Sequence, residues 1–302
     1  MTDFLEQVVA ERRADVEAAR STQSQADLEV ALPDNLWTRA ERTGARDLLA
    51  RYPHTTFPVR QGDAFTAALN ARRSAGQLAV IAEVKRVSPA LGTLASDIDP
   101  ARQARRYADA GAAAISVLTE PRHWGGSLRD LAAVRAAVTD RPILCKDIIV
   151  SEYQIVEARS AGADAVLLIA EALTDAELRR FIERASRLNM GALVEAHEPV
   201  AFGRAVASGA AVVGANARNL RRPKEIDVSR ARELQSFPRD EQIFVAESGI
   251  ESADDARLLP ARVDAILVGT ALMRADDPAP LVREMAAIRR TGKFERTTVH
   301  LR

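Results

Sequence analysis

Charged and amide side chains close several short apolar runs in this sequence. Glu83 and Lys85 stand two residues apart at the end of one run, so both point to the same side of an extended strand. Four other runs end in the same way, at Lys146, Glu195, Asn216 and Glu247. Carboxylates and ammonium groups placed together can exchange protons with a substrate, because burial and neighbouring charges tune their pKa values. The pattern predicts an acid–base active site.

The elements that must position these residues are parallel strands. From residue 79 onward, apolar runs alternate with segments of helical periodicity, and each interval has room for one helix and two loops. We count eight runs, namely Ala79–Lys85, Ala114–Leu118, Pro142–Lys146, Ala165–Ile169, Ala192–Glu195, Val212–Asn216, Ile243–Glu247 and Ala265–Gly269. They predict an α/β fold, a (β/α)8 TIM barrel, whose active site lies at the carboxyl ends of the strands. A structural ion pair is the alternative for any single polar residue, but polar ends on five strands favour a site.

Local signals support the helices between these strands. Thr174–Glu177 has the pattern of a capping box, and Ser151 and Ser252 open two further helices in a similar way. Three Gly-Ala pairs precede strands, and their glycines are suited to the left-handed residue that ends a helix: Gly111, Gly162 and Gly209.

The chain divides into three parts. Residues 1–78 contain a mixed-charge helix, Phe4–Ala19, and few strand signals, so we predict a helical extension packed on the barrel. Residues 79–290 form the barrel. Residues 291–302 lack apolar periodicity and are predicted to be a mobile tail.

Composition excludes several classes of protein. The 302 residues include 42 basic and 42 acidic side chains, so the chain lacks the net positive field of a nucleic-acid or anionic-membrane binder. Cys145 is the single cysteine, which excludes an intrachain disulfide and fits a reducing compartment. No apolar run approaches the roughly 20 residues of a membrane span, and the start lacks a signal-peptide pattern. We predict a cytoplasmic protein, while the oligomeric state stays open.

Two glycine-containing junctions predict an anion site. Glu247–Ile250 follows the seventh strand and Val268–Leu272 follows the eighth, and Gly249 and Gly269 allow backbone N–H groups to approach a ligand closely. Loops after these strands commonly bind phosphate in TIM barrels. A small phosphorylated substrate is therefore the expected partner.

Nine segments together resemble the indole-3-glycerol-phosphate synthase family. They follow one another in unbroken order from roughly residue 79 to 278, and the N-terminal helix is similar more loosely. The segments are Ile81–Pro89, Ser116–Glu120, Gly125–Ser127, Lys146–Asp147, Glu152–Ile155, Leu193–Glu195, Gly214–Arg218, Val245–Ile250 and Leu267–Met273. The resemblance implies a carboxy-lyase of tryptophan biosynthesis, which converts 1-(2-carboxyphenylamino)-1-deoxyribulose 5-phosphate to indole-3-glycerol phosphate with loss of CO2 and water, and which needs no cofactor or metal.

The same resemblance implies roles for individual residues. Lys146 would be the general acid, with Glu83, Lys85, Glu195 and Glu247 serving the remaining acid–base steps in an order that stays open. Substrate orientation would fall to Asn216, Arg218 and Ser248. The phosphate would be held by Ser88, Gly249, Gly269 and Thr270 beside Lys85, and the anthranilate ring would lie in an apolar slot of Pro89, Trp124, Ile148 and Leu220. Ordinary packing is the alternative for Trp124.

Several positions depart from the family's usual pattern. Ile148 replaces a phenylalanine after the Lys-Asp pair, Asn219 replaces an aspartate, and Ala90–Gly92 is less polar than usual. The segment from about residue 40 to 75 is also longer. These departures leave open a duplicate enzyme that acts on a modified anthranilate substrate for an indole metabolite.

Three other classes are alternatives. A Schiff-base aldolase would use Lys85 or Lys146 as the nucleophile. A non-catalytic binder of phosphorylated metabolites should lack an acid–base residue, and none is missing. A metal enzyme is disfavoured because the histidines show no ligand spacing: His54, His123, His197 and His300. His197 is expected near the rim of the site.

Overall fold

The computed structural model describes residues 3–30, 32 and 63–290, and its centre is a closed barrel of parallel strands. Around the barrel the order is β1-β10-β9-β8-β7-β6-β5-β4. The strands are β1 (Ala79–Val84), β4 (Ala114–Leu118), β5 (Ile143–Lys146), β6 (Ala165–Ile169), β7 (Gly191–Ala196), β8 (Val212–Asn216), β9 (Ile243–Glu247) and β10 (Ala265–Val268). The predicted TIM barrel is confirmed, since each apolar run coincides with one strand to within one residue at either end.

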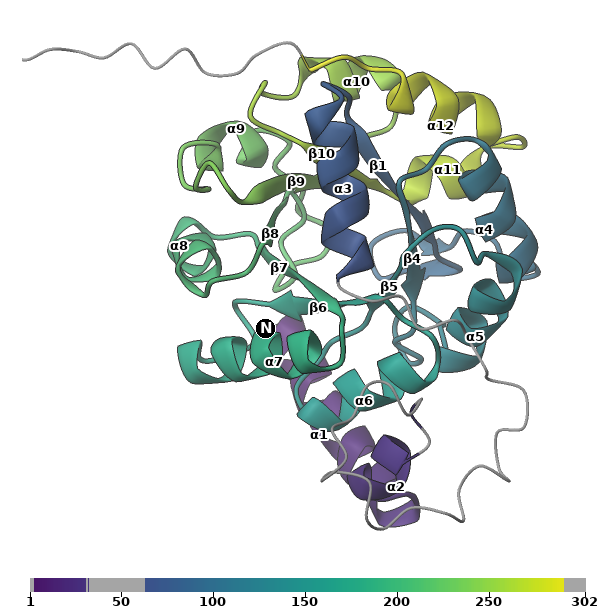
Figure 1. Ribbon diagram of the computed structural model, residues 1–302, viewed down its shortest axis with the longest axis vertical. Coiled ribbons are helices and arrows are strands. Elements are labelled where there is room, and N and C mark those ends of the chain that lie inside the picture. Colours follow the sequence, from purple (N-terminus) through teal and green to yellow (C-terminus); the bar gives the residue numbers. More distant parts are fainter. Residues whose placement is uncertain (1–2, 31, 33–62, 291–302) are drawn as a thin grey trace, which may run out of the picture.

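Helices surround the barrel and connect its strands (Figure 1). They are α4 (Pro100–Asp109), α5 (Leu128–Ala137), α6 (Glu152–Ser160), α7 (Asp175–Arg187), α8 (Pro199–Ala207), α9 (Arg230–Leu234), α10 (Ala253–Leu258), α11 (Thr270–Arg274) and α12 (Ala279–Ala286). The predicted capping box at Thr174 is present, and Ser252 makes a second one with Asp255. Gly111, Gly162 and Gly209 have φ values of 101°, 98° and 89°, which confirms the left-handed backbone expected of them.

Burial alternates along the strands and separates two layers of core. In β1, Val80 and Val84 face the surrounding helices, whereas Ala79 and Ile81 pack inside the barrel. This is the two-residue period of an extended chain. At the carboxyl end, the same inward direction carries Glu83 and Lys85 into the mouth of the barrel. Among the described residues the interior is therefore mostly apolar at depth, and Glu83 and Lys85 lie at the carboxyl ends of the strands.

Helix α3 (Ala64–Ser74), which the sequence did not predict, covers the amino-terminal end of the barrel. It lies across the centre of the view in Figure 1. Its side chains Phe65 and Leu69 are fully buried in the same cluster as the inward residue Ile81. The helix begins at Asp63, whose carboxylate accepts from the backbone N–H groups of Phe65 and Thr66.

Helix α1 (Phe4–Thr22) lies against the opposite end, and the short α2 (Gln25–Val30) follows it. The predicted helix Phe4–Ala19 is confirmed and continues to Thr22. Leu5 and Val8 are buried, and the Phe4 N–H donates to the carbonyl of Arg221, in the loop after β8. The predicted tail, 291–302, and most of the longer segment lie outside the described residues.

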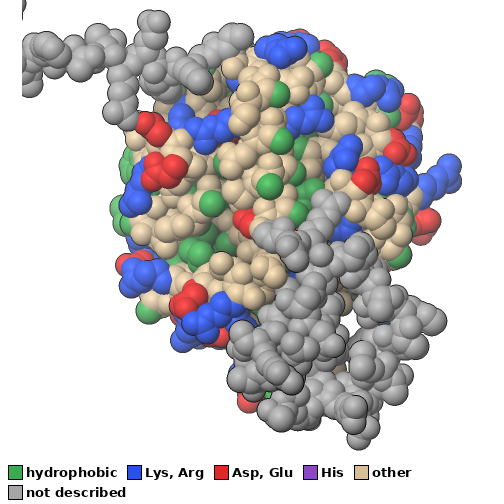
Figure 2. All heavy atoms as spheres, in the orientation of Figure 1, with side chains coloured by type: hydrophobic (Ala, Val, Ile, Leu, Met, Phe, Trp, Pro, Cys, Tyr) green, Lys and Arg blue, Asp and Glu red, His purple; other side chains and the backbone are tan. Residues whose placement is uncertain are grey.

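The surface mixes charges of both signs. On the face shown in Figure 2, Lys and Arg side chains alternate with Asp and Glu around the edge, as the balanced composition suggests. Within the described residues, no helix is long and apolar enough to cross a membrane.

Candidate active site

One pocket opens at the carboxyl ends of the strands, and every residue predicted for catalysis or substrate binding lines it. The strands supply Glu83, Lys146, Glu195, Asn216 and Glu247, each from one of the last two residues of its strand. Loops between strands and helices supply the others. A short hairpin that the sequence did not predict, β2 (Val87–Ser88) with β3 (Gly92–Thr93), presents the Ser88 side of the pocket.

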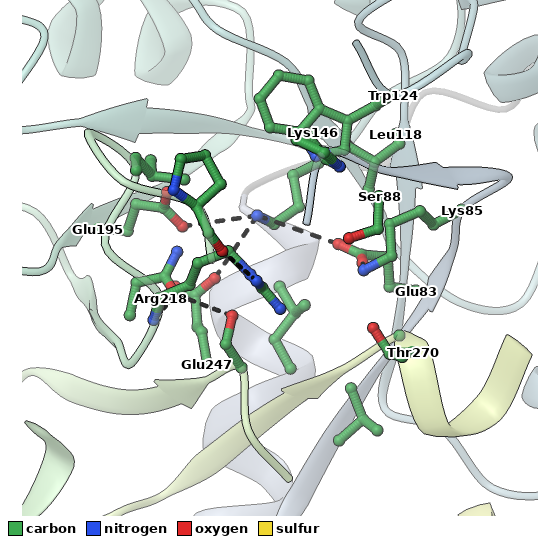
Figure 3. Close-up of a pocket in the computed structure, with 18 of the residues that line it drawn as sticks. Glu83, Lys85, Ser88, Leu118, Trp124, Lys146, Glu195, Arg218, Glu247 and Thr270 are labelled. Carbon is green, nitrogen blue, oxygen red and sulfur yellow. Dashed lines mark hydrogen bonds and ion pairs between the residues drawn. The ribbon is translucent and has the colours of Figure 1, made fainter. Parts of the chain in front are cut away.

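Lys146 lies at the centre of this pocket, among three buried carboxylates (Figure 3). Its Nζ atom is 3.6 Å from Glu195, 3.8 Å from Glu247 and 4.0 Å from Glu83. Each of the three glutamate side chains is at most 3% exposed. Glu83 also pairs with Lys85, at 2.7 Å. The site thus holds two ammonium groups and three carboxylates away from bulk water.

The electrostatics of the cluster favour a protonated lysine. Burial alone would lower the pKa of Lys146, but attraction to the three glutamates outweighs it and raises that pKa well above the ordinary value. For Glu83, burial opposes ionisation, yet Lys85 and Lys146 lower its pKa. An ammonium held in this way stays protonated at neutral pH, so it can donate hydrogen bonds to a developing oxyanion but offers no free amine. This disfavours Lys146 as the nucleophile of a Schiff-base aldolase.

Glu247 behaves differently from Glu83. Burial, followed by the negative charge of Glu195, raises the pKa of Glu247 well above its usual range, and Lys146 only partly offsets this. The carboxylate oxygens of Glu195 and Glu247 are buried and accept no hydrogen bond from the described residues. Buried polar atoms without partners are expected where a substrate completes the network.

The backbone after β9 is held in an uncommon conformation. Ser248 and Gly249 have φ values of 67° and 71°. A serine in the left-handed region costs free energy, and such strained conformations are often found at functional sites. The Ser248 hydroxyl donates to the Asn216 side-chain oxygen at 2.9 Å, and the Arg218 backbone N–H donates to the same oxygen at 2.9 Å. Asn216 therefore fixes the position of the serine and of the arginine chain beside the glutamates.

Two glycines make room for the carboxylates. A Cβ atom on Gly269 would collide with Glu83 and approach the Nζ of Lys85 to 3.1 Å, and one on Gly214 would collide with Glu247. The sequence assigned Gly269 to an anion site because its N–H is accessible. The structure adds a second requirement, namely space for the Glu83–Lys85 pair.

The loop after β4 is organised by Glu120, a residue to which the sequence reasoning gave no role. Its buried carboxylate accepts from the backbone N–H groups of Arg122, His123 and Trp124 at 3.0, 2.6 and 3.0 Å. These three bonds bring the Trp124 ring to the pocket (Figure 3), where Phe4 of α1 packs against it. An acidic residue four positions before the tryptophan is the signal in the sequence that could have found it.

An apolar side of the pocket faces this tryptophan. Ile148 is buried, and Trp124 and Leu220 pack against the cluster that contains it. Pro89 lines the same pocket. The pocket is also lined by the glycines after β9 and β10, with Ser88, Lys85 and Thr270, and Gly269 lies beside the Glu83–Lys85 pair. The arrangement can hold a molecule with an aromatic end and an anionic end, with Lys146 between them.

Histidines do not form a metal site in the described part of the chain, and no group of three or more His, Cys, Asp or Glu side chains there is arranged to hold a metal ion. His197 lies at the rim, where its Nδ1 is 2.8 Å from the carbonyl of Asn216. His123 pairs with Glu11 of α1 at 2.6 Å. His54 and His300 lie outside the described residues.

A carboxyl outside the pocket predicts a pH effect on stability. Burial raises the pKa of Glu157, on α6, from 4.5 to about 7, although Arg12 opposes the shift. The folded state therefore binds more protons than the unfolded state between these values, so this group makes stability fall as pH rises through that window. Replacing Glu157 with glutamine should remove this fall. The free energy of unfolding of the variant, relative to the parent, should therefore be about 1 to 3 kcal/mol higher at pH 8 than at pH 4.5.

Urea unfolding of both proteins at pH 4.5, 6 and 8 would test this prediction. The exposed Glu183 provides a matched control, since a glutamine there should leave the pH dependence unchanged. An identical pH dependence in the Glu157→Gln variant and the parent would show that Glu157 titrates normally.

Comparisons with known proteins agree with this geometry. A family model described as indole-3-glycerol phosphate synthase matches residues 36–285. The indole-3-glycerol phosphate synthase of a Nocardioides species is 55% identical over 217 residues, covering 72% of this chain and 82% of that protein. The enzyme of the same name from Paenarthrobacter aurescens is 43% identical over 264 residues, covering 86% and 94%. Among solved structures, tryptophan synthase from Mycobacterium tuberculosis matches with a TM-score of 0.57 at 14% identity, covering 76% of this chain and 100% of that one, which shows the fold alone.

Proposed function

The chain belongs to the indole-3-glycerol-phosphate synthase family, and we propose that Lys146 is the general acid that starts ring closure. The enzyme is a carboxy-lyase that converts 1-(2-carboxyphenylamino)-1-deoxyribulose 5-phosphate to indole-3-glycerol phosphate, CO2 and water. The observation that carries the proposed role is the buried ammonium of Lys146 at 3.6 to 4.0 Å from three glutamates.

Ring closure requires a proton donor at the ribulose ketone. A carbon of the anthranilate ring attacks the ketone carbon, and the oxygen gains negative charge as the new bond forms. Lys146 lies at the centre of the pocket (Figure 3), so a substrate that spans the pocket would place its ketone near the ammonium. Proton transfer to that oxygen would stabilise the transition state.

The later steps need a base and a second acid. The cyclised intermediate has lost its aromaticity, and loss of CO2 from the ring restores it. The hydroxyl group then leaves as water with a proton from the site, while a carboxylate accepts the proton released as the pyrrole ring forms. We assign the role of base to Glu195 and the role of second acid to the Glu83–Lys85 pair. Its two charged groups are 2.7 Å apart.

Substrate binding follows the two ends of the pocket. Backbone N–H groups near Gly249 and Gly269, with Lys85 and Ser88, would hold the phosphate. Arg218 is partly buried in the pocket, and burial lowers its pKa without abolishing its charge. It would bind the carboxylate that is later lost.

A direct assay tests the proposed function. Purified protein is mixed with the carboxyphenylamino-deoxyribulose phosphate, and indole fluorescence and CO2 are followed together. Formation of both in equal amounts is expected. Binding without either product would contradict the assignment.

The pocket also supports a second candidate, an enzyme of the same family that prefers a ring-substituted anthranilate. Ile148, in place of the family's usual phenylalanine, gives the slot a smaller, non-planar wall. An aromatic contact adds about 0.5 to 1.5 kcal/mol beyond burial. We therefore expect Ile148→Phe to tighten binding of the unsubstituted substrate by roughly twofold to twelvefold and to disfavour methyl- or halo-substituted substrates.

Specificity constants for plain and substituted substrates in both proteins measure this effect. Val200→Phe, at an exposed position, is the control for adding a phenyl ring. Ile149→Phe is unsuitable because Ile149 is buried in the core between the strands and the surrounding helices. An unchanged ratio in the Ile148→Phe variant would mean that the substrate ring lies elsewhere.

Location and domain organisation complete the proposal. We infer a cytoplasmic enzyme from the balanced charge and the single buried, free Cys145. We also propose that residues 1–78 act as an extension of the barrel at 79–290, because α3 and α1 bury apolar side chains against its two ends.

A further inference from the structure

Helix α1 contacts the catalytic end through a largely buried arginine, Arg12. The Nε and Nη2 atoms of Arg12 donate to the two carboxylate oxygens of Asp147, each at 3.0 Å. The side chains of Arg12 and Asp147 are 11% and 6% exposed. A two-armed pair of this kind fixes direction as well as distance, because the guanidinium is planar.

Asp147 directly follows Lys146 in the chain and organises the backbone around it. Its Oδ2 accepts from the Thr119 hydroxyl at 2.8 Å, and its Oδ1 accepts from the Ile148 N–H at 2.7 Å. The Thr119 N–H donates in turn to the Lys146 carbonyl at 3.1 Å. Arg12, Asp147 and Thr119 therefore form one network around the residue that carries the general acid.

We propose that Arg12 is a positioning residue for Lys146, which acts through Asp147 and completes the active site from outside the barrel. The inference rests on the proposed role of Lys146. Stability alone does not explain the pair well, since burying two charges costs about as much as their attraction returns. The position of Asp147 accounts for the pair. Asp147 directly follows Lys146, the proposed general acid, and directly precedes Ile148, which lines the ring slot.

A second contact of α1 does not involve Asp147, and it provides a control. Arg221, in the loop after β8, pairs with Asp3 at the start of α1. Replacing Arg221 would weaken docking of the helix and leave the Arg12–Asp147 pair in place. It thus separates general docking of α1 from the specific hold on the lysine.

The experiment compares Arg12→Gln, Arg12→Lys and Arg221→Gln in the full chain, with kcat, KM and the thermal midpoint measured for each. For Arg12→Gln we expect kcat to fall roughly tenfold to a hundredfold, because a small displacement of a catalytic group has effects of this size. KM should change less than kcat, because the network reaches the substrate pocket at Asp147 and the Ile148 N–H and does not include the phosphate side. Arg12→Lys keeps the charge but loses one arm, so its kcat should be intermediate. Arg221→Gln should keep the parental kcat.

The outcomes are distinguishable. An unaltered kcat in Arg12→Gln, or equal losses in Arg12→Gln and Arg221→Gln, would overturn the positioning role. A lysine variant as active as the parent would also overturn it, because charge alone would then suffice. If Arg12→Gln does not fold, the comparison of Arg12→Lys with the parent decides the question. An inactive parent protein would instead refute the proposed function.

Discussion

Replacing Lys146 with alanine is expected to lower kcat for ring closure by about 10²- to 10⁴-fold, the usual cost of losing a general acid. The ammonium is closer to Glu195, Glu247 and Glu83 than any other described cation except Lys85, which pairs with Glu83. Its removal takes away the proton donor. It also leaves buried carboxylates to bind protons from solvent, since an uncompensated buried charge is costly.

Binding provides the decisive control for this variant. The phosphate side of the pocket contains glycine N–H groups and Lys85, which Lys146→Ala does not alter. Affinity for indole-3-glycerol phosphate or inorganic phosphate should therefore remain within a few-fold of the parent. Lys224→Ala, at an exposed lysine, serves as the matched control for loss of one cation. Near-parental turnover in Lys146→Ala would refute the general-acid role.

Much of this site could be predicted because local patterns in the sequence encode it. A charge inside an apolar run is expensive unless it serves a purpose, so the sequence alone singles out Glu83, Lys146, Glu195 and Glu247. The βα repeat then places all of them at one end of a barrel. These two arguments need no knowledge of distant contacts.

The features that were missed depend on distant contacts. Arg12 and Asp147 lie 135 positions apart in the sequence, and nothing near either residue identifies its partner. Helix α3 follows a segment without clear periodicity, and only the open end of the barrel explains why Phe65 is buried. Such partners are selected by three-dimensional packing.

Gly214 and Gly269 show an intermediate case. The sequence marked both as parts of motifs, and flexibility or access to the backbone was the natural interpretation of Gly269. In the structure, the absent side chains leave space for Glu247 and Glu83. A volume requirement of this kind depends on which carboxylate lies opposite, and the strand register decides that: Gly269 directly follows Val268, which pairs with Ala82 of β1.

The roles of the two buried glutamates beside Lys146 can be separated by amide substitution. Glu195 is nearer to the Lys146 ammonium, at 3.6 Å against 3.8 Å for Glu247. Burial and the charge of Glu195 raise the pKa of Glu247 well above its usual range, so Glu247 is suited to hold a proton at neutral pH. Glutamine resembles a protonated glutamate in shape and charge. Glutamine at position 247 should therefore cost less activity than glutamine at position 195.

We expect Glu195→Gln to lower kcat by about 10²- to 10⁴-fold, because a base that accepts a proton cannot be replaced by an amide. Glu247→Gln should lower kcat by about tenfold or less, since it keeps the neutral form and the space beside Gly214. Steady-state kinetics of both variants, with thermal midpoints and phosphate affinity as checks on folding, measure the difference. Equal losses would mean that the two glutamates act as one unit around Lys146. A larger fall in kcat for Glu247→Gln would contradict the assignment. Glu247 would then be the base that accepts the proton released as the pyrrole ring forms.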